Sequence, residues 1–465
     1  MKLYDITIIG GGPSGIALAM MLYKTGKSIL LIEKERTLGG CWRVEWQDSK
    51  YYTEHSPHIT TSNYHKFFSL CKVLGVENKF EKTYKYHNAL LSVHLSKNVV
   101  GNLEFNDVIK LISGLIMSRF IENTQTVKEF SDHLSEKAKK ALYMIAVTAA
   151  STPDRVMMQD VFDEMQKSPP NIQQLKNPEL WIQKAEAYFK DIPNVDLVLN
   201  THIHSIKQNV GKDTTTFILN DSIESHKCIL ALPPIAICNI LKNSAQLIQD
   251  NWLPYDEFKQ WAYGSYYPSI GFQIHFDENV KYSDEWCWSC KGEWNVIILP
   301  MSKYLDTFSK DKTIKTVWSC TLIDQNNHSS YLKKKIHECS LEEIEVEVIR
   351  QLKIPKPKKV TFYDGLYKEN GYYMSKDTGF VRQKYGTIPY QGNLNNIHIV
   401  STVNKKGIIT MEAAIESCYD FVKQNYTGYE KILDASYDWK LIRILTFICV
   451  SLFVFFKYQQ SKTIR

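Results

Sequence analysis

The 465-residue sequence has no internal repeat, no low-complexity segment and no dense run of lysine and arginine. Its 56 basic and 50 acidic residues leave a net charge of +6, too small an excess to indicate a nucleic-acid partner. The 10 cysteines are scattered, and Cys287-Trp-Ser-Cys290 lacks the second CxxC that a zinc site needs, so we expect no metal. A strand-like segment opens the chain in place of a signal peptide, which favours reduced thiols and a cytosol-facing protein.

The C-terminal end carries a hydrophobic run. Between Ile444 and Phe456 only two side chains are polar, and the run is apolar on all sides rather than striped. It is short for a bilayer core of about 30 Å, but Arg443 and Lys457 can extend toward opposite interfaces. We expect a single-pass membrane-anchor helix over 440–457 that leaves the rest of the chain facing the cytosol. The alternative is a hydrophobic helix docked on the protein's own core.

The N-terminal segment has the order of a dinucleotide-binding unit. A buried parallel strand over 4–9 is followed by a GxGxxG pattern, a helix and a second strand over 28–33; the key positions are Gly10, Gly12, Pro13, Ser14, Gly15 and Glu33. The glycines permit a tight turn, close approach of a pyrophosphate and close helix–strand packing, and the helix N-terminus favours an anion. Glu33 ends the second strand, where an acidic side chain accepts hydrogen bonds from ribose hydroxyls. The segment therefore predicts a Rossmann-like unit.

A second glycine pair follows in "EKERTLGGCWR" (33–43). A domain that binds only a nicotinamide dinucleotide does not need a backbone segment that returns past its own pyrophosphate there. The arrangement resembles the two-dinucleotide-binding flavoproteins, in which this doublet and a following arginine touch FAD. The resemblance implies FAD as the cofactor, with contacts from Lys34, Gly40, Cys41, Trp42 and Arg43. No cysteine lies in 367–400 to attach the flavin, so we expect non-covalent binding.

Four further stretches resemble the flavin-containing amine oxidase superfamily, which includes the phytoene desaturases. "TEHSPHI" (53–59) is similar to a loop beside the flavin ring, and "VDLVLNTHIHSIKQ" (195–208) to the strand pair that clamps adenine, with Ile203 at the clamping position. "KCILALPPIAICNIL" (227–241) is similar to the strand that leads back to the substrate domain. The segment 395–422 is similar to the closing strand, loop and helix, where the resemblance adds Thr402 and Met411 to the cofactor contacts.

The sequence departs from this family at positions that matter for chemistry. Amine oxidases carry a lysine on the strand equivalent to 267–276, bonded to a water near the flavin; here Gln273 and His275 are the nearest polar residues. Thr410 replaces an aromatic wall residue, and the acidic turn near Thr402 is missing. His58 is the candidate catalytic residue, from its place in "SPHI". "GGCWR" also resembles the GGxW of flavin monooxygenases, but no second GxGxxG follows in 44–465.

We therefore predict an α/β fold in which a Rossmann-like FAD-binding domain of the two-dinucleotide-binding type is combined with a discontinuous α+β substrate domain and a C-terminal hydrophobic helix. The expected boundaries are 1–75, 191–250 and 390–430 for the FAD domain, and 76–190 and 251–389 for the substrate domain. The expected function is an FAD-dependent oxidoreductase that oxidises a C–N or C–C bond of a small amine or apolar substrate. The alternatives are a flavin-dependent desaturase or isomerase, and a catalytically silent FAD-binding membrane protein. The substrate, electron acceptor and oligomeric state stay open.

Overall fold

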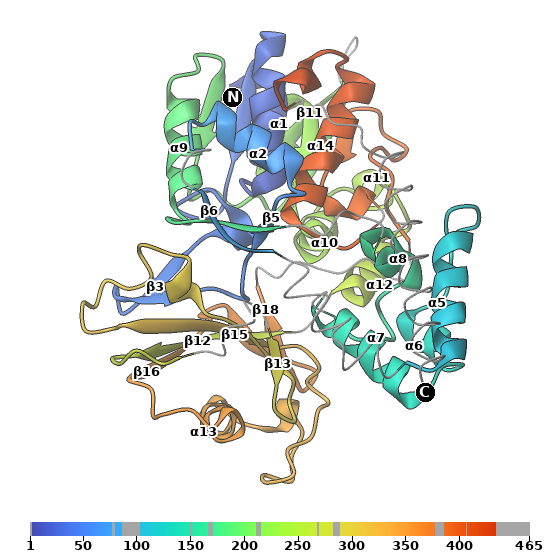
Figure 1. Ribbon diagram of the computed structural model, residues 1–465. Coiled ribbons are helices and arrows are strands. Elements are labelled where there is room, and N and C mark those ends of the chain that lie inside the picture. Colours follow the sequence, from blue (N-terminus) through green and yellow to red (C-terminus); the bar gives the residue numbers. More distant parts are fainter. Residues whose placement is uncertain are drawn as a thin grey trace.

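The fold is described from a computed structural model (Figure 1). The structure describes residues 2–76, 80–85, 103–148, 151–165, 171–210, 215–266, 269–281, 289–376, 386–405 and 407–433. Segments from the beginning, middle and end of the chain build the upper part of the view in Figure 1, an antiparallel sheet lies below it, and a group of helices stands beside that sheet.

A seven-stranded sheet forms the upper part, in the order β8-β2-β1-β11-β10-β9, with β19 added on β11. Its strands are β1 (Leu3–Ile9), β2 (Ile29–Ile32), β8 (Val195–Val198), β9 (Ile206–Val210), β10 (Thr215–Leu219), β11 (Ile223–Leu230) and β19 (Ile397–Ile399). Strand β1 lies parallel between β2 and β11, whereas β9 and β10 pair antiparallel. The central strands are aliphatic on both faces, as expected where helices cover both sides of a parallel sheet.

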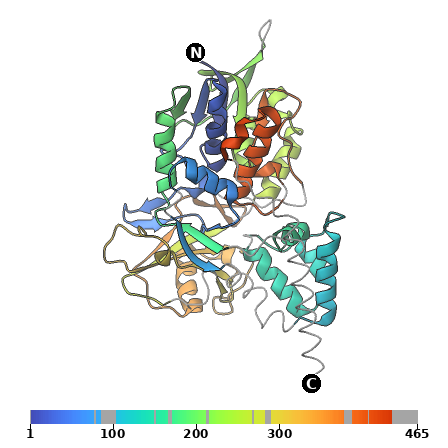
Figure 2. The same ribbon diagram turned by 45° about the horizontal axis from the view of Figure 1, so that its top comes forward.

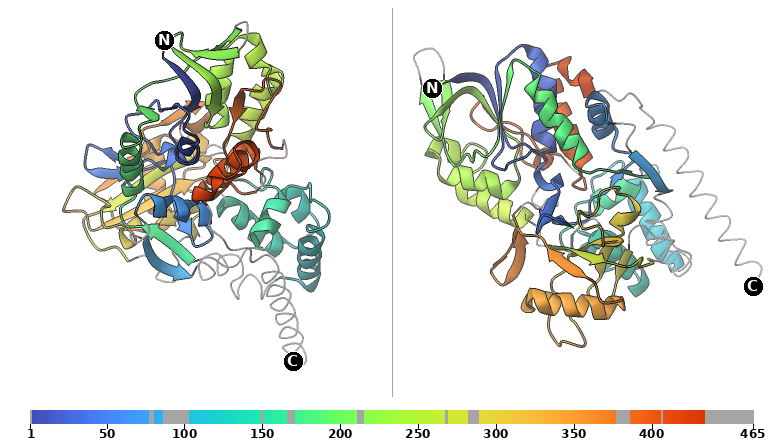
Figure 3. Two further views of the ribbon diagram at one scale, coloured as in Figure 1. Left: turned by 90° about the horizontal axis from the view of Figure 1, so that it is seen from above. Right: turned by 90° about the vertical axis from the view of Figure 1, so that its left-hand side faces the viewer.

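Helices cover both faces of this sheet. One side carries α1 (Pro13–Leu22), η1 (Tyr23–Thr25), α2 (His65–Val73), α9 (Leu180–Lys190), α14 (Met411–Asn425) and η8 (Tyr429–Leu433). The other side carries α10 (Pro234–Lys242), α11 (Gln246–Gln249) and α12 (Tyr255–Ser265). All of α1 is buried, because it has no charged side chain to present to water. Helices α1 and α14 pack side by side although they come from distant parts of the chain (Figure 3).

The lower part contains a five-stranded antiparallel sheet in the order β13-β14-β15-β12-β16. Its elements and neighbours are β12 (Ile270–Phe276), β13 (Ser289–Lys291), β14 (Val296–Leu299), η5 (Met301–Lys303), β15 (Thr316–Leu322), η6 (Ile336–Glu338), α13 (Leu341–Leu352), β16 (Lys359–Phe362), β17 (Leu366–Glu369) and β18 (Tyr372–Ser375). Alternate residues of β12, such as Phe272 and Ile274, enter an apolar core shared with α13. The residues between them, Gly271, Gln273 and His275, face the other way, which leaves a polar row on the second face of the sheet.

The remaining elements connect and flank these parts. Helices α5 (Phe105–Met117), α6 (Val127–Ser131), α7 (Glu136–Thr148) and α8 (Met158–Met165) form a small core of their own, which stands as a lobe beside the antiparallel sheet (Figure 2). The short strands are β3 (Glu45–Gln47), β4 (Tyr51–Thr53), β5 (Thr60–Thr61), β6 (Phe80–Lys85) and β7 (Asn171–Leu175), and two further 3₁₀ turns are η2 (Gly40–Trp42) and η7 (Thr402–Asn404). Strand β4 lies against β12 and β16, so the chain leaving the upper part covers the polar face of the lower sheet.

The α/β class and the Rossmann-like unit are confirmed, whereas the membrane prediction is corrected. Within the residues that the structure describes, no helix combines the length and the apolar character needed to cross a bilayer. The expected anchor over 440–457 lies outside the described residues. We therefore do not retain the membrane location, the membrane partner or the C-terminal hydrophobic helix. The predicted domain boundaries stay predictions.

Candidate functional site

The loop between β1 and α1 is too tightly packed for side chains at two of its glycines. Gly10 has a φ of +107°, and a Cβ there would lie 2.5 Å from the Ala231 carbonyl oxygen. A Cβ on Gly15 would lie 1.8 Å from the Gly10 carbonyl oxygen. Gly12 differs, because its Cβ would meet only the Gly40 Cα at 3.8 Å. The space at Gly12 is therefore left open by the protein, at the N-terminus of α1, where free backbone N–H groups favour an anion. Pro13 begins the helix at a position where no N–H is needed.

Glu33 closes this loop from the end of β2. Its side chain is 5% exposed, and its Oε2 accepts a hydrogen bond from the Gly11 N–H at 2.7 Å, while its Oε1 accepts from the Glu35 N–H at 3.0 Å. Burial raises the pKa of this carboxyl, although both N–H donors oppose the shift. The acid thus stands beside the glycine loop, where a ribose acceptor is needed. Its neighbour Lys34 is exposed and pairs with Glu35 at 3.5 Å, and its charge lowers the pKa of Glu33.

The second glycine pair lies directly on the first. The Gly39 N–H donates to the Gly11 carbonyl oxygen at 2.8 Å, and a Cβ on Gly40 would come within 3.0 Å of the Gly12 Cα. Both residues have positive φ, +114° and +56°, which favours glycine. Two backbone segments therefore meet at one end of α1, and this open, amide-rich cradle fits the diphosphate of a dinucleotide.

The other predicted cofactor residues lie on several elements of the upper part of the molecule. The Cys418 thiol of α14 donates to the Ser14 carbonyl oxygen at 3.4 Å, so the helix that begins at Met411 packs on the loop. Ile203 is buried in the core under the sheet, and its segment is tied to the end of β2 because the Thr201 N–H donates to the Glu33 carbonyl oxygen at 3.0 Å. Thr402 begins the short turn η7 before α14.

Helix α14 is anchored by a buried acid that was not among the predicted site residues. Glu412 accepts hydrogen bonds from the N–H groups of Lys66 at 2.7 Å and Phe67 at 2.9 Å, and so caps the N-terminus of α2. Burial raises the pKa of Glu412 to about 8 despite these donors. Thr410 caps α14 itself, accepting from the Ala413 N–H at 3.0 Å.

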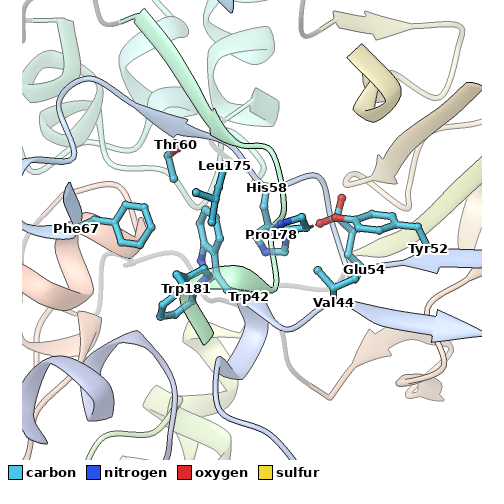
Figure 4. A pocket seen from close by; sticks show the side chains of 10 residues that line it. All are labelled: Trp42, Val44, Tyr52, Glu54, His58, Thr60, Phe67, Leu175, Pro178 and Trp181. Carbon is cyan, nitrogen blue, oxygen red and sulfur yellow. Dashed lines mark hydrogen bonds and ion pairs between the residues drawn. The ribbon is translucent and has the colours of Figure 1, made fainter. Parts of the chain in front are cut away.

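A pocket opens where the upper and lower parts meet. Its lining is mostly apolar, from Trp42, Val44, Tyr52, Thr60, Phe67, Leu175, Pro178 and Trp181, and its charged members are Glu54 and His58 (Figure 4). The Trp42 ring follows directly on the glycine doublet and lies 4.6 Å from the His58 ring, centroid to centroid. The pocket therefore begins where the dinucleotide cradle ends. Arg43 turns aside and pairs with Glu45 at 3.7 Å.

His58 is held by an acid four residues before it. Its Nδ1 lies 2.7 Å from Glu54 Oε2, and Figure 4 shows the carboxylate directed at the ring. Burial by itself lowers the pKa of His58, but hydrogen bonds to Cys41 and Glu54 more than offset this and raise it to about 9. The neighbouring His55, whose ring lies 4.7 Å away, has a pKa well below its usual range because of burial and the charges of His58 and Arg43.

Glu54 and Ser319 were missed by the sequence reasoning, which named Gln273 but not its contact with Glu54. The Ser319 hydroxyl donates to Glu54 Oε1 at 2.5 Å, and the Gln273 side chain bonds the Glu54 main chain. Glu54 stands within the segment 53–59 quoted above, and its i, i+4 spacing to His58 is a signal that was available. Ser319 carries no such signal, because only the pairing of β12 with β15 places it opposite Gln273.

Comparisons with known proteins agree with this geometry. The family model of an NAD(P)-binding Rossmann-like domain matches residues 8–74. In sequence, the UDP-galactopyranose mutase of Mycoplasma pneumoniae is 26% identical over 134 residues, which are 28% of this chain and 32% of the mutase. The UDP-galactopyranose mutase of Mycoplasma genitalium is 27% identical over 111 residues, which are 23% of this chain and 26% of the mutase. The alignments thus span about a third or less of those relatives.

Solved structures match over nearly the whole chain. A putrescine oxidase is similar with a TM-score of 0.60 at 14% identity, covering 91% of this chain and 98% of the oxidase. The cyclohexylamine oxidase of Brevibacterium oxydans also gives 0.60 at 14% identity, covering 91% and 99%, and a protein from Pyrococcus furiosus gives 0.60 at 12%, covering 94% and 100%. The resemblance inferred from the sequence is therefore confirmed at the level of fold: this chain shares the fold of these two amine oxidases.

Proposed function

We propose that the protein is an FAD-dependent oxidoreductase that acts on a C–N or C–C bond of a small, largely apolar substrate. The single observation that carries this proposal is the interlock of two glycine segments with Glu33. The Gly39 N–H bonds the Gly11 carbonyl oxygen at 2.8 Å, and the Gly11 N–H bonds Glu33 at 2.7 Å. A nicotinamide-only Rossmann unit has no use for the second segment, whereas an FAD that extends from this cradle toward the pocket does.

The residues that would hold FAD fit its parts. The backbone at Gly12 and Gly40, together with the N-terminus of α1, offers N–H groups to the diphosphate, and Glu33 offers acceptors to the ribose. Ile203 would contact the adenine and Met411 the flavin end; Ile203 lies in the segment whose Thr201 N–H is tied to Glu33, and Met411 begins α14. When bound, FAD supplies the acceptor for the electron pair removed from the substrate. The chain's own contribution is a pocket that excludes water and orients the substrate carbon.

The pocket suits such a substrate. Aromatic and aliphatic side chains such as Trp42, Phe67, Trp181 and Leu175 supply most of its wall, and the Glu54–His58 pair supplies its charged groups. Flavin-dependent oxidation requires few acid–base groups from the protein, so one such pair is sufficient for orientation and proton handling.

A flavin-dependent isomerase or desaturase is the second candidate. Two observations favour it: the sequence relatives are UDP-galactopyranose mutases, and Gln273 stands on β12 where the amine oxidases carry a lysine. Because Gln273 is engaged with Glu54, it is not available to hold a water as that lysine does. In this reading the flavin acts without net transfer of electrons out of the site.

The absorption spectrum of the purified protein tests the shared step. We expect the visible bands of bound flavin, either as isolated or after reconstitution with FAD. Anaerobic mixing with a panel of amines, alcohols and unsaturated compounds should then bleach these bands if the protein is an oxidoreductase. Turnover of a substrate that leaves the oxidised spectrum unchanged at the end, and requires reduced flavin, would favour the isomerase. A bound flavin that no compound reduces would support a catalytically silent protein, and a protein that takes up no flavin would refute all three.

A further inference from the structure

Resting on the proposed flavin function, we propose that His58 selects the substrate by donating a hydrogen bond to an oxygen. In this proposal Glu54, Gln273 and Ser319 are positioning residues that fix the His58 ring. The pocket would then take a molecule with an apolar body and a terminal carboxylate or carbonyl oxygen, and would reject the same body carrying a protonated amine. This narrows the proposed substrate class toward oxygen-bearing compounds.

Glu54 is not available to bind an ammonium group. Its side chain is 3% exposed, and both of its carboxylate oxygens are engaged: Oε2 lies 2.7 Å from His58 Nδ1, and Oε1 accepts from the Ser319 hydroxyl at 2.5 Å. Tyr52, which is also buried, adds a hydrogen bond to the same carboxylate. A buried and fully bonded carboxylate orients its partners rather than a ligand.

Gln273 holds Glu54 through the main chain. The Gln273 Oε1 accepts from the Glu54 N–H at 3.1 Å and from the Thr53 hydroxyl at 2.8 Å, and its Nε2 donates to the Glu54 carbonyl oxygen at 3.0 Å. Its Nε2 also donates to the Ser319 hydroxyl at 3.2 Å. Gln273 itself is fully buried in the middle of β12. A neutral amide with both a donor and an acceptor is needed for this pattern, which a lysine does not offer.

The chain approaches Gln273 closely because β12 has a glycine two residues before it. A Cβ on Gly271 would lie 1.9 Å from the His55 carbonyl oxygen, so the segment 53–58 rests directly on the strand. His58 therefore belongs to a loop that is braced at Gly271, Gln273 and Ser319, and its ring position is set by the lower sheet.

The groups around the His58 ring favour its protonated form. The titratable and charged groups that face it are Glu54, Cys41 and His55, with Arg43 and Tyr52 beyond them. Burial lowers the pKa of His58, but the bonds to Cys41 and Glu54 raise it to about 9, whereas burial keeps His55 neutral. An imidazolium donates from both nitrogens, and Glu54 occupies Nδ1.

The second partner of the His58 ring is the Cys41 side chain. The Cys41 thiol hydrogen-bonds His58, and sulfur is a poor acceptor compared with a carboxylate or carbonyl oxygen. A substrate oxygen in the pocket would take this bond, whereas an ammonium would be repelled by the charged ring. The walls formed by Trp42, Phe67 and Trp181 then enclose the apolar body.

The state of His58 is measured first, by NMR titration of histidine side chains in the full-length protein. His58 is assigned from the spectrum of His58→Asn. Glu54→Gln should lower the His58 titration midpoint by about two pH units, because the charged partner is lost. Glu179→Gln is the matched control: Glu179 is a nearby acid that accepts from Trp46 Nε1 and makes no bond to His58, so the midpoint should stay within a few tenths of a unit. An unchanged midpoint in Glu54→Gln would overturn the positioning role.

Selectivity is measured by calorimetry with two probes that share one apolar body, 4-phenylbutyrate and 4-phenylbutylamine, on the flavin-loaded protein at neutral pH. The carboxylate should bind at least about tenfold more tightly than the amine. One charge-assisted hydrogen bond contributes more free energy than a tenfold difference in dissociation constant corresponds to. The preference should disappear in His58→Asn and Glu54→Gln and persist in Glu179→Gln.

Equal binding of both probes, tighter binding of the amine, binding of neither, or a preference that survives in folded His58→Asn would each overturn the inference. These outcomes differ from failure of the proposed function, because the NMR and binding measurements do not depend on flavin reduction. A protein that binds flavin and oxidises amines would keep the function and refute the selectivity.

Discussion

Replacement of Gly12 by alanine should separate cofactor binding from folding. A methyl group at this position would meet only the Gly40 Cα, at 3.8 Å, which is an ordinary contact. The backbone there is extended, with φ −74° and ψ −175°, so alanine adopts it without strain. Because alanine restricts the unfolded chain more than glycine does, we expect unfolding free energy to be unchanged or up to about 1 kcal/mol higher.

The same methyl group should weaken FAD binding. It would stand at the N-terminus of α1, between the two glycine segments, where the backbone must approach the diphosphate closely. Displacing the diphosphate from one charge-assisted hydrogen bond costs about 1.5–3 kcal/mol. This corresponds to a dissociation constant raised about 10- to 100-fold.

Thermal unfolding and flavin titration of two variants test this reasoning. Gly15→Ala is the contrasting variant, because its Cβ would lie 1.8 Å from the Gly10 carbonyl oxygen and must disrupt the turn itself. We expect Gly12→Ala to unfold at the temperature of the wild type or above while FAD binding weakens, and Gly15→Ala to be destabilised without any ligand. Unimpaired FAD binding by Gly12→Ala would refute the assignment of the cradle.

Further predictions concern stability. His398 is buried, and its ring nitrogens have no hydrogen-bond partner among the described residues. Burial lowers the pKa of His398 to about 4. The neutral ring therefore contributes its full share of folding stability above pH 6.5, and this contribution is lost as pH falls toward 4. His398→Leu should remove an acid sensitivity on the order of 3 kcal/mol, read from urea unfolding across this range. The pKa of Glu412 is raised to about 8, so its protonated form contributes stability fully below pH 4.5, and this contribution is lost as pH rises through 8. When the pH is raised from 4.5 to above 8, the urea midpoint of Glu412→Gln should therefore fall less than that of the wild type. Gly271→Ala should cost at least about 2 kcal/mol, measured by chemical unfolding, because its Cβ would overlap the His55 carbonyl oxygen; wild-type stability would show that the loop does not rest on β12.

Local sequence patterns predicted the upper part of the molecule well. The strand expected over 4–9 is β1 (Leu3–Ile9), the helix expected from Ser14 is α1 (Pro13–Leu22), and the strand over 28–33 is β2 (Ile29–Ile32). These elements are specified by neighbours in sequence: aliphatic runs, a glycine spacing and a proline that begins a helix. In the lower sheet, β14 and β15 are likewise rich in strand-forming residues that lie next to one another in sequence.

Features that depend on distant residues were not predictable in this way. The segment from Val127 to Thr148 is divided into α6 and α7, and at the break the Ser135 hydroxyl and N–H both donate to Asp107 of α5. The Glu54 cluster likewise combines segments near positions 54, 273 and 319, which come together only when β4 lies against β12 and β12 pairs with β15. The resemblance at "SPHI" named His58 as a candidate, but did not name Glu54 or Ser319, which hold it in place.

The position of the positive charge links these observations. The family resemblance implies a lysine on β12, and its absence at Gln273 weakens a simple amine oxidation. In the structure the glutamine holds Glu54, and the hydrogen bonds of Cys41 and Glu54 raise the pKa of His58 to about 9, which favours a cation at the pocket on the loop instead of the strand. A cation at the end of a flexible lysine side chain can hold a water. An imidazolium whose loop is fixed by contacts with Gly271, Gln273 and Ser319 points its donor in one direction. The two arrangements therefore suit different ligands: the braced ring favours a fixed oxygen acceptor over a mobile water.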